Sequence, residues 1–124
     1  MVIGVGIDLE EVARIGELLA KWGERIEKKL FTDGERAYCN ARGKREQHFA
    51  ARFAAKEATL KALGVPRGLS WHELEVVSAG NGAPTLRLGG VAAAEAAKRG
   101  VQRTHLTLTH AGGLAVAVVV LDGA

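Results

Sequence analysis

The sequence has little of what defines disulfide-rich, aromatic-rich or membrane-embedded proteins. Its 124 residues include one cysteine, Cys39, so no disulfide can form within the chain and no multi-cysteine metal site is available. Aromatic residues make up only 5% of the chain, which leaves Val, Leu, Ile and Ala to build the core. No apolar run approaches the ~20 residues that a membrane-spanning helix needs. We therefore expect no membrane span and, from the low cysteine content, a cytoplasmic protein.

The first residues and the overall composition narrow the class further. MVIGVGIDLEE has no basic region and becomes acidic within ten residues, so we expect no signal peptide. The chain is 48% hydrophobic and 25% charged, which suits one globular domain spanning residues 1–124. The formal net charge of +3 predicts an anionic partner. Nucleic acid, an acidic protein and a phosphate-bearing small molecule would all satisfy that charge.

Hydrophobic spacing predicts the elements of the first third of the chain. Residues 2–7 are mostly β-branched and include two glycines, which predicts a buried strand that another backbone can approach closely. Asp8 is placed to cap a following helix, with a glutamate three residues later, and Gly23 is placed to end it. The charged segment 24–43 predicts one or two short helices.

The remainder of the chain predicts a long helix, a hairpin, a short helix and two final strands. The expected bounds are Glu46–Leu63 for the long helix, Trp71–Ser78 and Pro84–Leu88 for the hairpin around the AGNG turn, Val91–Arg99 for the short helix, and Thr104–His110 and Leu114–Leu121 for the final strands. The last stretch, LAVAVVVL, is typical of a central strand. No repeat or linker divides the sequence, so we expect one α+β domain.

The segment FAAKEATLKALG, residues 53–64, places three charges among good helix formers. At roughly 100° per residue, the apolar stripe of the helix includes Lys56, and Arg52 lies at one edge of that stripe. Glu57 and Lys61 lie on the opposite shoulder, four residues apart, where an exposed pair is worth only ~0.3–0.5 kcal/mol. Two interpretations are open: an ordinary ion pair beside the core, or a carboxylate and an ammonium that meet a charged ligand.

The ammonium of a lysine inside the apolar stripe must either reach solvent or pair with an acceptor. The stem of Lys56 can extend along the stripe and bring its ammonium to solvent. Alternatively, the ammonium pairs with a carboxylate or with a ligand phosphate. An unpaired buried ammonium would cost several kcal/mol, so this face of the helix favours a partner or a ligand.

Asp8 and His110 are the other candidates for chemistry. Considered alone, Asp8 is typical of a helix cap, and His110 is typical of a structural histidine at the end of a strand. Their occurrence together with Glu57 and Lys61 makes a functional role for Asp8 and His110 more credible than it is for either residue alone. Carboxylates for a hard cation, and cationic groups for phosphate oxygens, are what a metal-assisted phosphate chemistry needs.

Three motifs resemble the signatures of bacterial holo-acyl-carrier-protein synthases, in the same order. GIDLEEVAR, residues 6–14, resembles their first signature, G-[IV]-D followed six residues after the Asp by Arg. RFAAKEATLKALG, residues 52–64, is similar to the second, F-x-x-K-E-A-x-x-K-A. HLTLTH, residues 105–110, is similar to the third. The second motif is long and specific, and the three matches span nearly the whole chain.

The resemblance implies a small, single-module 4′-phosphopantetheinyl transferase. Such enzymes use Mg²⁺ to transfer 4′-phosphopantetheine from coenzyme A to a serine of apo acyl carrier protein. They release adenosine 3′,5′-bisphosphate and support fatty acid biosynthesis. The family fold is compact α+β, with a small, mainly antiparallel sheet packed against a long central helix. The resemblance also implies a homotrimer with nucleotide sites between the subunits.

The same resemblance implies roles for individual residues. Asp8 and Glu57 match the Mg²⁺ ligands, and Lys61 matches the lysine that faces the pyrophosphate, so these three are the expected catalytic residues. The serine proton would pass to Glu57 or to a water bound to the ion.

The remaining matched positions concern the nucleotide and the carrier protein. His110 is expected near the adenosine 3′-phosphate, where Lys44, Arg45 and Arg52 would add further contacts to coenzyme A. Arg14 matches the arginine that meets the acidic recognition helix of the carrier protein. Further basic residues would extend that surface: Lys21, Arg25, Lys28 and Lys29.

Two rival functions have weaker support. A nucleic-acid-binding module would suit the positive charge, but the aromatic residues show no stacking pattern and no helix-turn-helix, RNP or zinc motif is present. A non-catalytic subunit that binds coenzyme A or a carrier protein would not need Asp8, Glu57 and Lys61 together. We therefore expect an enzyme and no nucleic-acid partner.

Overall fold

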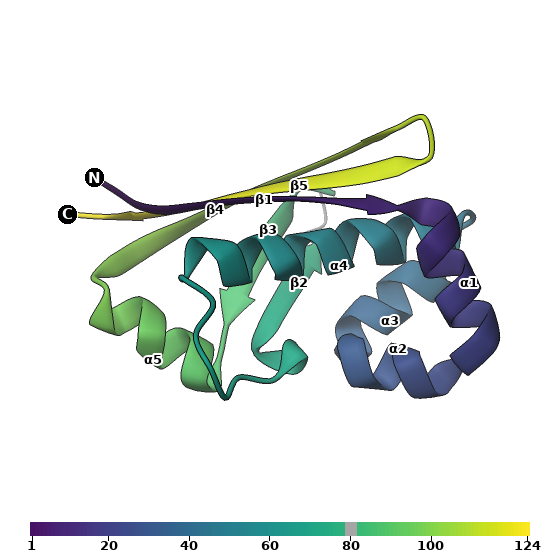
Figure 1. The fold of residues 1–124 in the computed structure, drawn as a ribbon, viewed down its shortest axis with the longest axis horizontal. Helices are drawn as coiled ribbons and strands as arrows, with labels where there is room; N and C mark the ends of the chain where they lie inside the picture. The colour runs from purple at the N-terminus through teal and green to yellow at the C-terminus, as the bar shows by residue number, and fades with distance from the viewer. Residues whose placement is uncertain (79–81) are drawn as a thin grey trace.

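The computed structural model describes residues 1–78 and 82–124. These residues form a sheet, a long helix along its inner face and a further layer of short elements (Figure 1). The α+β prediction is confirmed. The predicted AGNG turn lies outside the described residues except for Gly82. Within the described ranges, no helix is both long and apolar enough to cross a membrane.

The sheet has three antiparallel strands in the order β1–β5–β4. Their bounds are Val2–Glu11 for β1, Leu114–Gly123 for β5 and Val101–Ala111 for β4. The prediction of a central strand in the last apolar stretch is therefore confirmed. Successive side chains of a strand point to opposite faces, and the inner face of β5 carries four buried residues: Ala115, Ala117, Val119 and Leu121.

Helix α4 (Arg45–Ala62) runs along the inner face of the sheet and contacts β1 and β5 (Figure 1). The contact with β1 is close, because a Cβ atom on Gly4 or Gly6 would collide with the carbonyl oxygens of Ala62 and Ala58. The prediction that the glycines of the first strand admit another backbone is confirmed, but the prediction of a buried strand is wrong, because Val5, Ile7 and Leu9 on its other face are exposed. This contact holds β1 against the second half of α4.

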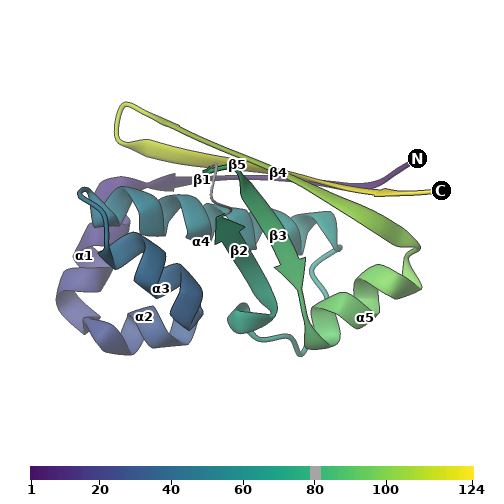
Figure 2. The ribbon, with the colours of Figure 1, turned by 180° about the vertical axis from the view of Figure 1, so that it is seen from behind.

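Short helices and a hairpin lie on the side of α4 away from the sheet (Figure 2). These elements are α1 (Val12–Trp22), α2 (Glu24–Leu30), α3 (Asp33–Asn40), β2 (Leu74–Ser78), β3 (Pro84–Leu88) and α5 (Gly90–Lys98). Helices α1 to α3 lie at one end of α4, α5 lies at the other, and the β2–β3 hairpin lies between them (Figures 1 and 2). The charged segment 24–43 thus folds as two helices.

Three predicted boundaries were wrong, and one of them is the start of β4, which begins at Val101 rather than at Thr104. Asp8 does not cap a helix, because β1 continues to Glu11 through its register with β5, and Glu11 occupies the N-cap position of α1. The backbone N–H and C=O groups of this segment pair with β5, so they do not need a hydrogen bond from the side chain of Asp8. The hairpin strand does not begin at Trp71, because Trp71–Glu73 forms a 3₁₀ turn (η1) that Ser70 and Glu73 cap reciprocally.

Lys56 is buried in α4, as its place in the apolar stripe predicted. Its ammonium forms an ion pair with the carboxylate of Glu35 in α3. Of the alternatives considered from the sequence, the structure therefore shows an internal carboxylate partner. Lys56 of the segment FAAKEATLKALG therefore links α4 to α3.

Candidate active site

Three predicted catalytic residues lie along the contact between β1 and α4. The Nζ atom of Lys61 is 3.2 Å from Oδ1 of Asp8 and 3.0 Å from the carbonyl oxygen of Ile7. Glu57 lies one turn before Lys61 in α4. Burial and the negative charge of Asp8 raise the pKa of Glu57, and the ammonium of Lys61 partly opposes them. The ion pair of Lys61 therefore joins the helix to the strand.

A third carboxyl group, Glu10, belongs to the same place and was not predicted. It follows Asp8 by two residues in β1, so both side chains point to the same face of the strand. Burial, a hydrogen bond with Asp8 and the negative charges of Asp8 and Glu57 raise the pKa of Glu10 to about 8. The guanidinium of Arg14 acts in the opposite direction. We call the group of four the acidic flank: Asp8, Glu10, Glu57 and Lys61.

The acidic flank has the donor set that a magnesium ion requires. Mg²⁺ binds through one or two carboxylates and completes its octahedral shell with water and substrate phosphate oxygens. Oδ2 of Asp8 is a buried acceptor with no hydrogen-bond partner among the described residues. In those same residues, no three or more His, Cys, Asp or Glu side chains are placed to hold a metal ion together. Asp8 and Glu57 thus fit an ion that takes most of its shell from solvent and substrate.

Arg52 carries a buried positive charge on the other side of α4. The residue is 4% exposed. Its guanidinium donates to Oγ of Ser78 at 2.8 Å and to the carbonyl oxygen of His48 at 3.4 Å, and it lies 4.0 Å from the ring centroid of Tyr38. These partners are neutral, and the Nε atom has no partner among the described residues. A buried cation without a counter-ion is costly, so this site favours an anionic ligand.

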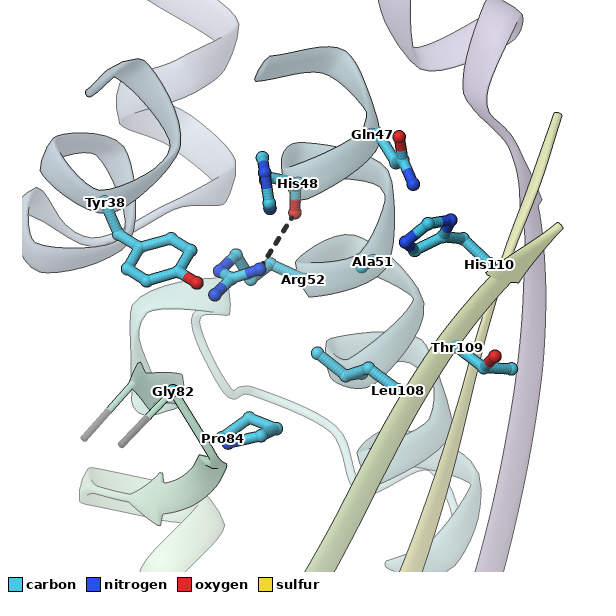
Figure 3. Close-up of a pocket in the computed structure, with 10 residues that line it drawn as sticks. All are labelled: Tyr38, Gln47, His48, Ala51, Arg52, Gly82, Pro84, Leu108, Thr109 and His110. Atoms are coloured by element: carbon cyan, nitrogen blue, oxygen red, sulfur yellow. Dashed lines mark hydrogen bonds between the residues drawn. The ribbon is translucent and has the colours of Figure 1, made fainter. Parts of the chain in front are cut away.

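Arg52 lines a cavity of about 180 Å³ between α4, β4 and Tyr38 of α3 (Figure 3). Gln47 and His48 line it from α4, and His110 projects from β4 toward the helix. Pro84 and Leu108 supply an apolar wall. We call this pocket the basic cavity. Positive and neutral donors beside an apolar wall suit a phosphate that is attached to an organic group.

The two basic residues at the start of α4 have different surroundings. Lys44 borders a second cavity of about 260 Å³, which His110 and the glycines of the β4–β5 turn also line. Arg45 instead pairs with Glu27 of α2 at 2.9 Å and donates to Oδ1 of Asn40 at 3.1 Å. Lys44 therefore adjoins the basic cavity through His110, whereas the guanidinium of Arg45 is held by α2 and α3.

Within one chain, the acidic flank and the basic cavity lie on opposite sides of α4. Arg52 and Lys61 are nine residues apart, so at ~100° per residue they project about 180° apart around the helix. The strand order also separates the two groups, because Asp8 lies on β1 and His110 lies on β4, with β5 between them. The predicted site residues therefore lie in two separate groups, which we call half-sites because the resemblance implies one site between subunits.

Comparison with known proteins assigns this chain to a family. The model of the 4'-phosphopantetheinyl transferase superfamily matches residues 4–119. The holo-[acyl-carrier-protein] synthase of Anaeromyxobacter dehalogenans (strain 2CP-C) is 55% identical over 127 residues, which cover 100% of this chain and 98% of that protein.

Solved structures agree with these sequence matches. The holo-[acyl-carrier-protein] synthase of Neisseria meningitidis superposes with a TM-score of 0.85 at 28% identity, covering 98% of this chain and 99% of that one. A holo-(acyl-carrier-protein) synthase from Bacillus anthracis str. Ames, in complex with CoA (3',5'-ADP), gives 0.80 at 31% identity, covering 100% and 99%.

The fold and the sequence matches are those of a family of group-transfer enzymes. The chain belongs to the 4'-phosphopantetheinyl transferase superfamily, and it is similar in sequence and structure to holo-[acyl-carrier-protein] synthases.

Proposed function

We propose that this protein is a Mg²⁺-dependent holo-acyl-carrier-protein synthase that acts as a single domain, residues 1–124, in the cytoplasm. It transfers 4′-phosphopantetheine from coenzyme A to a serine of apo acyl carrier protein and releases adenosine 3′,5′-bisphosphate, in support of fatty acid biosynthesis. The observation that carries the proposal is the convergence of Asp8, Glu57 and Lys61, which are distant in sequence, on one flank of α4.

The residues of the acidic flank suit this transfer. The serine oxygen bonds to the phosphorus that carries pantetheine, and the bond from that phosphorus to the bridging oxygen breaks, leaving the electron pair on adenosine 3′,5′-bisphosphate. Lys61 offsets the negative charge that develops on the leaving phosphate. Glu57 accepts the serine proton. Mg²⁺ held by Asp8 and Glu57 would supply charge neutralisation at the pyrophosphate.

The basic cavity suits the nucleotide part of coenzyme A. The uncompensated guanidinium of Arg52 and the imidazole of His110 face a space bounded by Pro84 and Leu108. The 3′-phosphate would bind the cationic groups, and Lys44 would add a contact from the neighbouring cavity. Arg45 would join them only by exchanging its pairing with Glu27 for the ligand.

A homotrimer would unite the two half-sites. On the outer face of the sheet, Val5, Ile7 and Leu9 of β1 are 59%, 58% and 53% exposed. Beside them in register on β5 lie Val120, Val118 and Val116. An apolar strip of this kind is typical of a subunit interface. Packing of this face between three copies would bring the acidic flank of one subunit to the basic cavity of the next.

The surface of α1 and α2 suits an acidic carrier protein. Arg14 is exposed on α1, within electrostatic reach of Glu10 in the acidic flank. Trp22 at the end of the same helix is 47% exposed and borders a cavity of about 340 Å³ together with Arg25 and Lys29. An aromatic anchor surrounded by positive charge matches a partner helix that is acidic with an apolar face.

The test is a transfer assay read by mass spectrometry. The purified chain is mixed with coenzyme A, Mg²⁺ and an apo carrier protein, and the carrier is examined for the added phosphopantetheine arm. We expect the mass gain with Mg²⁺, its loss after chelation, and its return when the ion is restored. A carrier in which the acceptor serine is replaced by alanine is the control. Absence of any mass gain with the complete mixture would reject the proposal.

A further inference from the structure

The basic cavity contains an imidazole that none of the motifs includes. His48 lies in the first half of α4, one turn before Arg52, and lines the cavity that Arg52 and His110 also line (Figure 3). Its ring contacts the ring of Tyr38 edge-on, with the centroids 5.7 Å apart. Figure 3 shows the ring between Tyr38 and Gln47. The side chain is thus positioned by an aromatic neighbour at the border of the proposed phosphate site.

The groups that act on the pKa of His48 are basic. Arg52 faces it from the same helix, Arg42 from the turn after α3, and His110 from β4, while Tyr38 is its titratable neighbour on α3. Burial, followed by the charges of Arg52, Arg42 and His110, lowers the pKa of His48. The ring is therefore neutral near neutral pH in the free protein. A phosphate dianion in the cavity would oppose these charges and favour the imidazolium.

We propose that His48 is a further phosphate-binding residue of the basic cavity and that it takes up one proton from solvent when the nucleotide phosphate enters. This inference rests on the proposed function. The incoming proton goes to a ring nitrogen of His48, which then donates a charge-assisted hydrogen bond to a phosphate oxygen. Nucleotide affinity therefore contains a component that strengthens as pH falls through the range from about 8 to 6.

The test measures proton uptake directly. Adenosine 3′,5′-bisphosphate is titrated into the full-length protein by calorimetry in two buffers that differ in ionisation enthalpy, at several values between about pH 6 and pH 8. Proton release from the two phosphates of the ligand, each with a second pKa of about 6, forms a background that is measured in every variant. The difference between variants therefore reports the protein.

The decisive variant is His48→Asn, with His48→Gln as a second non-titrating replacement. His72→Asn is the matched control, because His72 is exposed in η1 and does not line the cavity. On binding the nucleotide, wild type and His72→Asn should each take up more protons than either His48 variant, by as much as one proton per site. The affinity ratio between wild type and a His48 variant would then grow by up to about tenfold per pH unit as pH falls.

Two further ligands test whether the proton uptake depends on the 3′-phosphate. Coenzyme A should show the same difference between wild type and His48→Asn, and 3′-dephospho-coenzyme A should show none. Equal proton uptake by wild type and both His48 variants, with adenosine 3′,5′-bisphosphate bound, would overturn the inference and leave the proposed function standing. Failure of the wild-type protein to bind either coenzyme A or adenosine 3′,5′-bisphosphate would overturn both.

Discussion

The Nζ atom of Lys56 lies 2.7 Å from Oε1 of Glu35, and neither side chain is exposed to solvent. The same ammonium donates to the carbonyl oxygens of Trp71 at 2.9 Å and Leu74 at 2.7 Å, so each of its three hydrogens has an acceptor. Burial lowers the pKa of Lys56, and the carboxylate of Glu35 opposes that effect. The pair thus joins α4, α3 and the start of the hairpin.

Glu35→Gln is expected to destabilise the protein by about 3–5 kcal/mol, because it leaves a buried ammonium without its counter-charge. Urea unfolding followed by circular dichroism measures the change. Glu24→Gln is the control, since the Glu24–Lys28 pair is exposed with its charged atoms 3.7 Å apart and should contribute less than about 0.5 kcal/mol. Similar losses of unfolding free energy in both variants would show that burial does not make the Lys56–Glu35 pair more important for stability than an exposed pair.

Glu57→Gln is expected to reduce Mg²⁺-dependent transfer by at least about 10²-fold while the protein stays folded, because both the ligand and the base roles need a carboxylate. Initial rates with coenzyme A and apo carrier protein, with circular dichroism as a folding check, measure the effect. Glu46→Gln, an exposed carboxylate on the same helix, should retain full activity. Unchanged rates in Glu57→Gln would remove Glu57 from the mechanism.

Mixed oligomers should recover activity that neither parent has. Asp8→Asn damages the acidic flank and Arg52→Ala damages the basic cavity, so in the proposed homotrimer each variant alone would lack one half of every site. When the two variants are denatured and refolded together, some interfaces pair an intact acidic flank with an intact basic cavity. We expect roughly a quarter or less of wild-type activity in the mixture, measured against each variant refolded alone. Failure to gain any activity over the parents would favour sites formed within one chain.

Arg14→Ala is expected to raise the KM for carrier protein several-fold and to leave the KM for coenzyme A nearly unchanged, because only the acidic partner depends on this positive charge. Steady-state kinetics with one substrate varied at a time measure both constants. Lys98→Ala is the control: it removes an exposed cation from α5, at the other end of the molecule from α1 (Figure 1). Equal changes in the two constants would contradict the docking role.

Glu27 should make stability depend on pH in the acidic range. Burial would raise its pKa, but hydrogen bonds and charges from Asn40, Arg45 and Arg36 outweigh burial, and the net shift is downward from 4.5. The unfolded chain therefore binds the proton more readily, and the stability that Glu27 contributes is lost as pH falls through its folded-state pKa. The difference in unfolding free energy between wild type and Glu27→Gln should shrink below about pH 4.5. A difference that stays constant with pH would contradict this.

Periodicity and turn residues predicted most elements, because each is decided by neighbours in the chain. The long helix, the central strand and the burial of Lys56 follow from spacing alone, since a helix repeats every 3.6 residues and a strand every two. The glycines of β1 predicted close backbone contact for the same kind of reason. The three motifs that resemble known synthases likewise depended only on the order of residues.

The errors arose where pairing with a distant strand decided the outcome. Asp8 has the local pattern of a cap, yet β5 extends β1 through it to Glu11. That extension also brings Glu10 to the acidic flank, which a strand ending at its predicted position would not have done. His48 was missed because its significance depends on His110 and Arg42, which other elements bring to the same cavity.

By itself, the sequence determined most of the helices and strands and the order of the family motifs, because those properties belong to local spacing and residue type. Tertiary structure alone decided that Lys61 pairs with Asp8, that Arg52 is buried with no counter-ion among the described residues, and that the two half-sites face away from each other. Those outcomes depend on the rotation of α4 beneath the sheet, which the packing of the whole core sets.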